Sequence, residues 1–137
     1  MLIHKYHEIS RLVGQTPLVR ISDNIYAKLE TYNPSGSVKD RMISFLVGRA
    51  LDRGEIKEDS VLVEATSGNT GIALSMFGSA LGLNTIIIMP SNMSAERKQM
   101  MRSYGAKIID VPPSDFKAAI ELRSKMCESD NKFWSPM

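Results

Sequence analysis

Several features that mark other protein classes are scarce in this sequence. A single cysteine, Cys127, cannot form a disulfide within the chain. No charge of one sign dominates, because 17 Lys and Arg residues are balanced by 15 Asp and Glu residues. The basic face that nucleic-acid binding requires is therefore not expected. The longest apolar run, residues 85–89, is far too short to cross a bilayer, so no membrane span is expected.

The residues that often carry chemistry on their own are also few. His4 and His7 have no cysteine or acidic partner at a metal-ligand spacing, so no metal site is expected. The amino terminus lacks the apolar core and cleavage site of a signal peptide, which together with the lone cysteine predicts a cytoplasmic protein. Four basic residues near one helix are expected to form a solvated face: Arg97, Lys98, Arg102 and Lys107.

What the sequence does contain is the composition of an ordinary globular domain. The chain has 137 residues, of which 43% are hydrophobic, enough for one folded unit with its own core. Residues 1–36 are predicted to form an amino-terminal arm with short strands at residues 18–21 and 25–29. Residues 37–137 follow a more regular pattern and are predicted to form a small α/β domain.

Strand and helix patterns alternate through residues 37–137. Strands are expected at residues 61–64, 85–89, 107–111 and 133–134. Helices are expected from Ser37 to Gly54, over residues 69–81, from a Ser94 cap to Gly105, and from Ser114 and Asp115 to about Met126. This alternation is typical of βα units and predicts an α/β fold, with a parallel sheet covered by helices on both faces.

One lysine, Lys39, lies at the expected start of a helix. Pro34 and Gly36 form a turn before it, and Ser37 is expected to be the helix N-cap, with Asp40 completing a capping box. An amine in the first helical turn lies at the positive end of the dipole, which disfavours its ammonium form and suits Schiff-base chemistry. The alternative is an ordinary solvated lysine, the commonest role of this residue type.

A second candidate is the loop of residues 66–71, between an expected strand and an expected helix. Backbone N–H groups at such a helix start bind carboxylates or phosphates, and the loop adds small hydroxyl and amide side chains. It is not a Walker loop and lacks the spacing of a dinucleotide fingerprint. The alternative is a tight turn that is merely rich in turn-forming residues.

Taken together, ordered motifs over nearly the whole chain resemble the cysteine synthase family of pyridoxal-phosphate enzymes. The matching segments are residues 13–19, residues 28–30 leading into the Ser-Val-Lys-Asp-Arg box at 37–41, the asparagine loop at 64–73, and residues 89–97. The Asp-Arg after the lysine and the Glu-Ala before the loop resemble B-type cysteine synthases and, nearly as well, cystathionine β-synthases. The resemblance implies the small domain of the tryptophan synthase β-like fold.

The resemblance also implies roles for single residues. Lys39 would hold pyridoxal 5'-phosphate covalently and remove the substrate's α-proton, and Asn69 would hydrogen-bond the cofactor ring. The substrate carboxylate would be bound by Thr66, Ser67, Gly68, Asn69 and Thr70. The implied reaction is β-replacement, which forms L-cysteine from O-acetylserine or a related activated serine and a sulfur nucleophile.

Members of this family are longer, and their phosphate-binding glycine loop follows the region matched here. The chain is therefore expected to be truncated and incomplete for catalysis alone. The alternatives are cystathionine β-synthase-type activity, a non-catalytic module that binds a carboxylate or a peptide tail, and an inactive remnant. Besides an amino-acid substrate, the expected partners are a second copy, a complementing carboxyl-terminal half, or the tail of serine acetyltransferase.

Overall fold

A computed structural model describes residues 1–136, so the expected domain end at Met137 lies outside the described part. In chain order the elements are α1 (Leu2–Ser10), β1 (Leu18–Ser22), β2 (Ile25–Lys28), the 3₁₀ turn η1 (Glu30–Tyr32), α2 (Lys39–Asp52), β3 (Val61–Ala65), α3 (Asn69–Leu81), β4 (Asn84–Pro90), α4 (Ala95–Ser103), β5 (Lys107–Val111), α5 (Phe116–Ser129) and β6 (Phe133–Trp134).

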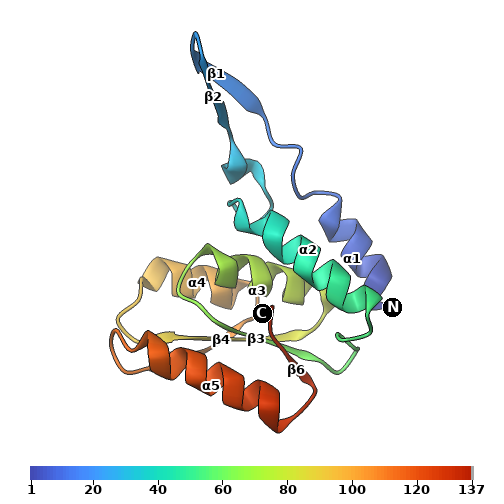
Figure 1. The fold of residues 1–137 in the computed structure, drawn as a ribbon, viewed down its shortest axis with the longest axis vertical. Helices are drawn as coiled ribbons and strands as arrows, with labels where there is room; N and C mark the ends of the chain where they lie inside the picture. Colours follow the sequence, from blue (N-terminus) through green and yellow to red (C-terminus); the bar gives the residue numbers. More distant parts are fainter. Residues whose placement is uncertain (137) are drawn as a thin grey trace.

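The centre of the molecule is a parallel sheet with strand order β5-β4-β3-β6. Helix α5 covers one face, and α3 covers the other with α2 and α1 packed outside it (Figure 1). The carboxyl ends of β3, β4 and β5 therefore lie at one edge, where each strand feeds a loop. The predicted fold class, a parallel sheet with helices on both faces, is confirmed.

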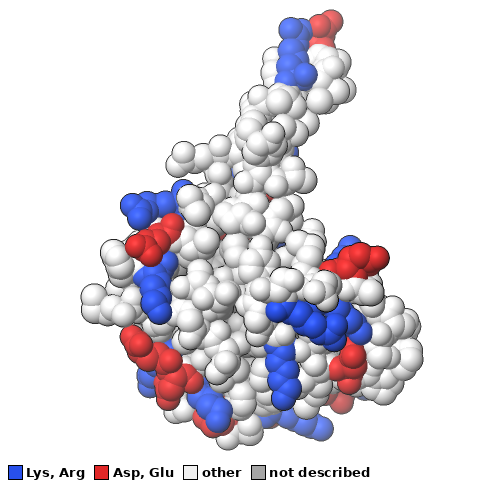
Figure 2. Space-filling view, turned by 180° about the vertical axis from the view of Figure 1, so that it is seen from behind, with Lys and Arg blue, Asp and Glu red and all other residues white. Residues whose placement is uncertain are grey.

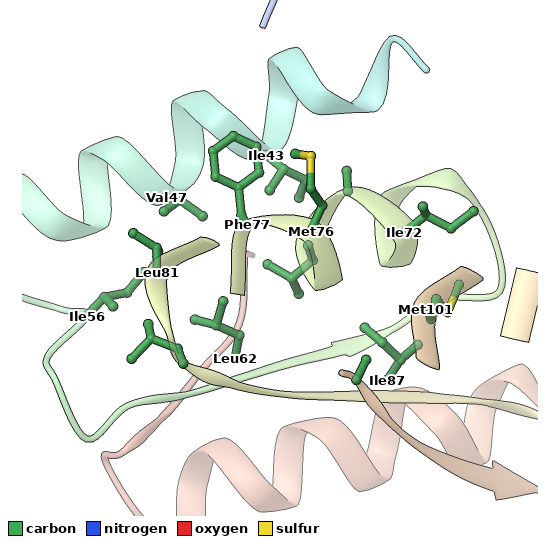
Figure 3. Packing of buried hydrophobic residues seen from close by; sticks show 14 of the residues in the cluster. Ile43, Val47, Ile56, Leu62, Ile72, Met76, Phe77, Leu81, Ile87 and Met101 are labelled. Atoms are coloured by element: carbon green, nitrogen blue, oxygen red, sulfur yellow. The ribbon is translucent and has the colours of Figure 1, made fainter. Parts of the chain in front are cut away.

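The core has two layers because the sheet is buried on both faces. Leu62 and Ile87 point towards α3, while their neighbours Val63 and Ile88 point towards α5, and all four side chains are fully buried. This explains why these strands read as continuous apolar runs rather than alternating ones. On the α3 side, Phe77 fills the space beneath α2 (Figure 3).

Strands β1 and β2 form an antiparallel hairpin that projects from the rest of the molecule (Figure 1). Both strands were expected from the sequence. The hairpin buries little, and Leu18, Ile21, Ile25 and Tyr26 are each more than half exposed. A two-stranded hairpin without further packing is only marginally stable in water.

Helix α1 was not expected, since only strands were predicted within residues 1–36. It packs against α2 and α3. Leu2 joins the main core, and the Tyr6 hydroxyl donates to the Ser44 carbonyl at 2.9 Å. Gly48 on α2 makes this approach possible, because a Cβ there would lie 2.3 Å from the Tyr6 hydroxyl oxygen.

The predicted helix caps of α4 and α5 are confirmed, whereas the predicted solvated basic face is wrong for one residue. Ser94 and Asp115 cap α4 and α5 as expected. Lys98 does not belong to a solvated face: it is 8% exposed, and its Nζ donates to the Ser91 carbonyl at 2.8 Å and to Asp110 at 2.7 Å. On the face shown in Figure 2, basic and acidic side chains are interspersed. None of the described helices is long and apolar enough to span a bilayer.

Candidate active site

The lysine segment and the asparagine loop, about thirty residues apart in sequence, meet at one cavity. The cavity has a volume of about 610 Å³ and is lined by Lys28, Leu29, Glu30, Thr31, Gly36, Ser37, Val38 and Asn69. Lys39 directly follows this lining as the first residue of α2, and its side chain is exposed. Thr66, Ser67, Gly68 and Thr70 lie in the same loop as Asn69 but do not line the cavity.

The asparagine loop connects β3 to α3 and leaves several donors available. Gly68 is the N-cap of α3, and its carbonyl accepts from the Gly71 N–H at 3.0 Å. Within residues 1–136, the backbone N–H groups of Ser67, Asn69 and Thr70 have no acceptor. These groups lie at the positive end of α3, an arrangement that favours an anion.

The glycines of this loop differ in their surroundings. A Cβ on Gly68 would meet nothing within 4 Å, so the backbone there is open to a ligand. A Cβ on Gly71 would lie 2.9 Å from both Met101 Cε and Thr66 Cγ2, so Gly71 allows α3 to pack closely. The Thr66 hydroxyl oxygen accepts from the Gly68 N–H at 3.4 Å, which helps to shape the turn.

On the lysine side, the expected capping box between Ser37 and Asp40 is wrong. Helix α2 begins one residue later than expected, with Val38 as its N-cap. The Ser37 hydroxyl accepts from the Lys39 N–H at 3.2 Å, while the Asp40 carboxylate turns back to Ser35. Asp40 is fully buried and accepts from both the Ser35 N–H, at 2.7 Å, and the Ser35 hydroxyl.

A polar cluster around Glu30 was missed in the sequence. Its carboxylate accepts from Arg41 Nε at 2.8 Å, from the Thr16 hydroxyl at 2.7 Å and from Asn33 Nδ2 at 2.8 Å. The Arg41 guanidinium, followed by the Thr16 hydroxyl, lowers the pKa of Glu30 from 4.5 to about 2. Arg41 is thus directed to Glu30, and Glu30 in turn is part of the cavity wall.

Glu64, just before the loop, is a second carboxylate with an altered environment. It is buried on β3, accepts from the Ala65 N–H at 2.7 Å and lies 3.6 Å from Arg123 Nη1. Burial raises the pKa of Glu64, against the opposing effects of the Ala65 N–H and the Arg123 charge. The Glu64–Arg123 pair connects β3 to α5 on the face of the sheet opposite the lysine segment.

The two carboxylates predict opposite dependences of stability on pH. Because the pKa of Glu30 is lowered on folding, its stabilising contribution is complete above pH 4.5 and is lost as the pH falls towards 2. Glu64, whose pKa is raised, acts in the opposite direction. We expect Glu30→Gln to unfold more easily than wild type at pH 7, with the difference shrinking steadily between pH 4.5 and pH 2.

Urea denaturation of both proteins across this pH range measures that difference, and Asp23→Asn in the exposed hairpin turn is the control. Asp23 also pairs with an arginine, Arg20, but its side chain is 96% exposed, so little effect is expected there. A gap between wild type and Glu30→Gln that stays constant down to pH 2 would contradict the assignment.

Comparison with known proteins places this geometry in context. The family model described as "Pyridoxal-phosphate dependent enzyme" matches residues 9–136. A cysteine synthase of Aquifex aeolicus is 49% identical over 115 residues, covering 77% of this chain and 35% of that protein. An O-acetylserine dependent cystathionine beta-synthase of Bacillus subtilis is 40% identical over 131 residues, covering 87% of this chain and 43% of that protein.

Solved structures agree with these relatives. A hydrogen sulfide-producing enzyme from Fusobacterium nucleatum superposes with a TM-score of 0.89 at 40% identity, covering 97% of this chain and 42% of that one. The chain therefore spans less than half the length of these three relatives.

Proposed function

The chain belongs to the family of pyridoxal-phosphate dependent enzymes, and from this premise we propose that it forms part of a cysteine synthase-like enzyme. The reaction is β-replacement, which forms L-cysteine from O-acetylserine, or a related activated serine, and a sulfur nucleophile. The observation that carries this proposal is the single cavity at which the lysine segment and the asparagine loop meet.

Two residues are proposed to hold pyridoxal 5'-phosphate. Lys39, an exposed residue that directly follows the cavity lining, would bind the cofactor covalently through its amine, and the amide of Asn69 on the cavity wall would hydrogen-bond its ring. When bound, the cofactor supplies an electron sink for removal of the substrate's α-proton. The donor types fit the aldehyde and the ring of this group, because an amine can bond to the aldehyde carbon and an amide can donate to a ring oxygen.

Binding of the substrate and transfer of its α-proton are proposed to be carried out by residues of this chain. The N–H groups of Ser67, Asn69 and Thr70, with the hydroxyls of Thr66, Ser67 and Thr70, would bind and orient the substrate carboxylate. The open backbone at Gly68 lets that carboxylate approach closely. The Lys39 amine, once free, would accept the α-proton on the lysine side of the cavity.

The division of the chain follows from the same proposal. Residues 37–137 would be the small α/β domain, and residues 1–36 an arm whose exposed hairpin packs on a further part of the enzyme. Four apolar hairpin side chains, each more than half exposed, support such a partner. A carboxyl-terminal half would supply that further part. Assembly into a homodimer, binding of the tail of serine acetyltransferase and a cytoplasmic location stay predictions.

The carboxylate site can be tested on this chain without the cofactor, because its donors lie within one loop. Titration with O-acetylserine is expected to shift the NMR amide resonances of Ser67, Gly68, Asn69 and Thr70. Ser67→Ala removes a hydroxyl donor to a charged group, worth about 1.5–3 kcal/mol, so affinity should fall by roughly tenfold or more. Ser79→Ala, at the exposed far end of α3, is the matched control and should leave the affinity unchanged.

The ligand series distinguishes the proposed enzyme from the alternative peptide-binding module. Similar weak binding of O-acetylserine, methionine and an isoleucine-ending peptide supports a substrate-carboxylate site, whereas strong preference for the peptide favours tail binding. If no ligand shifts the loop resonances, the carboxylate site is not formed in this chain and the proposal fails.

A further inference from the structure

Polar contacts connect the start of α2 to earlier segments of the chain. We call Thr16, Glu30, Asn33, Ser35, Asp40 and Arg41 the lysine-loop network. Besides the Glu30 contacts above, Arg41 Nη2 donates to Glu30 at 3.0 Å and to Thr16 at 3.2 Å. Asn33 Oδ1 accepts from the Gly14 N–H at 2.8 Å. The network thus links the first turn of α2 to three earlier segments of the chain.

Two members of the network, Asp40 and Asn33, are buried residues whose polar side chains form hydrogen bonds within this arrangement. Asp40 is fully buried, and its carboxylate accepts from the Ser35 N–H and hydroxyl at the positive end of α2, which favours a negative charge. Asn33 is 3% exposed, and its amide donates to Glu30 and accepts from Gly14. Buried polar groups of this kind have few alternative positions, because each lost partner is costly.

The network also fixes the side chains of the two residues that follow Lys39. Consecutive residues of a helix point about 100° apart. Asp40 is directed inwards to Ser35, and Arg41 is directed to Glu30 and Thr16. Lys39 itself is exposed, and the residue before it, Val38, lines the cavity.

The same contacts hold two walls of the cavity together. One wall is formed by residues 28–31, which include Glu30, and the other by residues 36–38, which directly follow Ser35. The contacts of Arg41 with Glu30 and of Asp40 with Ser35 both start from the first turn of α2. If either contact is lost, we expect residues 36–38 to move relative to Asn69.

We propose that Glu30, Asn33 and Asp40 are positioning residues that hold the Lys39 amine in line with Asn69 across the cavity. This inference rests on the proposed function, in which Lys39 binds the cofactor. None of the three is proposed to touch the reacting atoms. Their effect is geometric, and displacement of a reacting group by about 1 Å can slow a reaction by roughly a hundredfold.

The test measures where the aldehyde of pyridoxal phosphate reacts on the full chain. The lysine nitrogen forms a double bond to the aldehyde carbon with loss of water, and borohydride then adds hydride to that carbon and makes the link permanent. Mass spectrometry gives the rate at each lysine. In wild type, Lys39 should react faster than the exposed Lys125. In Asp40→Asn and Glu30→Gln, we expect the Lys39 rate to fall roughly ten- to a hundredfold, with Lys125 unchanged.

Three further measurements separate positioning from general loss of stability. Val63→Ala removes volume from the core between the sheet and α5, on the face of the sheet opposite α2, and should lower stability without changing the Lys39 rate. Ser35→Ala keeps the Ser35 N–H bond to Asp40 and loses only the hydroxyl bond, so it provides a milder variant if Asp40→Asn does not fold. Amide hydrogen exchange at residues 36–38 should speed up in the network variants and not in Val63→Ala.

The possible outcomes distinguish the inference from the function on which it rests. If wild-type Lys39 reacts no faster than Lys125, the proposed cofactor role of Lys39 fails, and the positioning inference fails with it. If wild-type Lys39 is preferred and folded network variants keep that preference, only the positioning inference is overturned. Loss of the preference together with faster exchange at residues 36–38 supports it.

Discussion

Replacement of Lys39 by alanine is expected to abolish covalent binding of pyridoxal phosphate when the chain is joined to the remaining part of a related cysteine synthase. Lys39 is exposed and directly follows Val38 of the cavity lining, and its amine is the group proposed to bind the aldehyde and to accept the α-proton. Loss of both roles should remove the visible absorbance of the bound cofactor and lower the rate of cysteine formation by a factor of ~10³ or more.

Two further variants make this result specific. Lys125→Ala removes an exposed lysine from α5, on the other face of the sheet, and should leave absorbance and rate unchanged. Lys39→Arg keeps a positive charge but no amine nucleophile, so it should behave like Lys39→Ala. If the absorbance survives in Lys39→Ala, another amine binds the cofactor and the role assigned to Lys39 is wrong.

The parts of the fold that the sequence predicted are those with strong local signals. Helix α3 was expected over residues 69–81 and has those bounds in the structure, because apolar periodicity and a glycine at each end define it. The strands β3 and β4 were expected because short apolar runs rich in β-branched residues are typical of strands buried on both faces.

The parts that could not be predicted depend on distant partners. The sequence indicated Ser37 as the partner of Asp40, and only the folded protein, in which Asp40 is buried, shows that Ser35 takes this role. The lysine-loop network contains residues from Thr16 to Arg41, and no local periodicity in the sequence indicates that these residues contact one another. The helical spacing of Leu2, Tyr6 and Ile9 is a weak signal for helix α1. These side chains are buried or partly buried only because α1 packs against α2 and α3.

Lys98 shows that the sequence alone also cannot indicate which basic side chains are buried. In sequence it is one of several basic residues near α4, and nothing distinguishes it from Arg97 or Arg102. In the fold it connects α4 to Asp110 on β5 and to the Ser91 carbonyl after β4. The meeting of the lysine segment with Asn69 was implied by resemblance to a family, since spacing alone cannot bring residues 36–38 to residue 69.

The largest expected effect on stability comes from Phe77→Ala. Phe77 is fully buried on α3, where its ring lies between α3 and α2 near Ile43 and Val47 (Figure 3). Its ring also lies 6.4 Å from that of Tyr6 on α1, so three helices meet around one side chain. Truncation leaves a cavity that α1 and α2 cannot both fill, and we expect the free energy of unfolding to fall by about 3–5 kcal/mol.

The chain contains a matched control for this substitution on the neighbouring helix. Phe45 on α2 has the same side chain but is 66% exposed, so Phe45→Ala should change the free energy of unfolding by no more than about 0.5 kcal/mol. Urea denaturation of the three proteins at pH 7 measures both effects, with similar slopes expected if folding remains two-state. Since small domains are stable by only about 5–15 kcal/mol, Phe77→Ala should be partly unfolded without denaturant if the wild type lies near the lower limit. Equal costs for the two phenylalanines would contradict the packing of α1, α2 and α3 around Phe77, and with it the support that these helices give to the lysine at the start of α2.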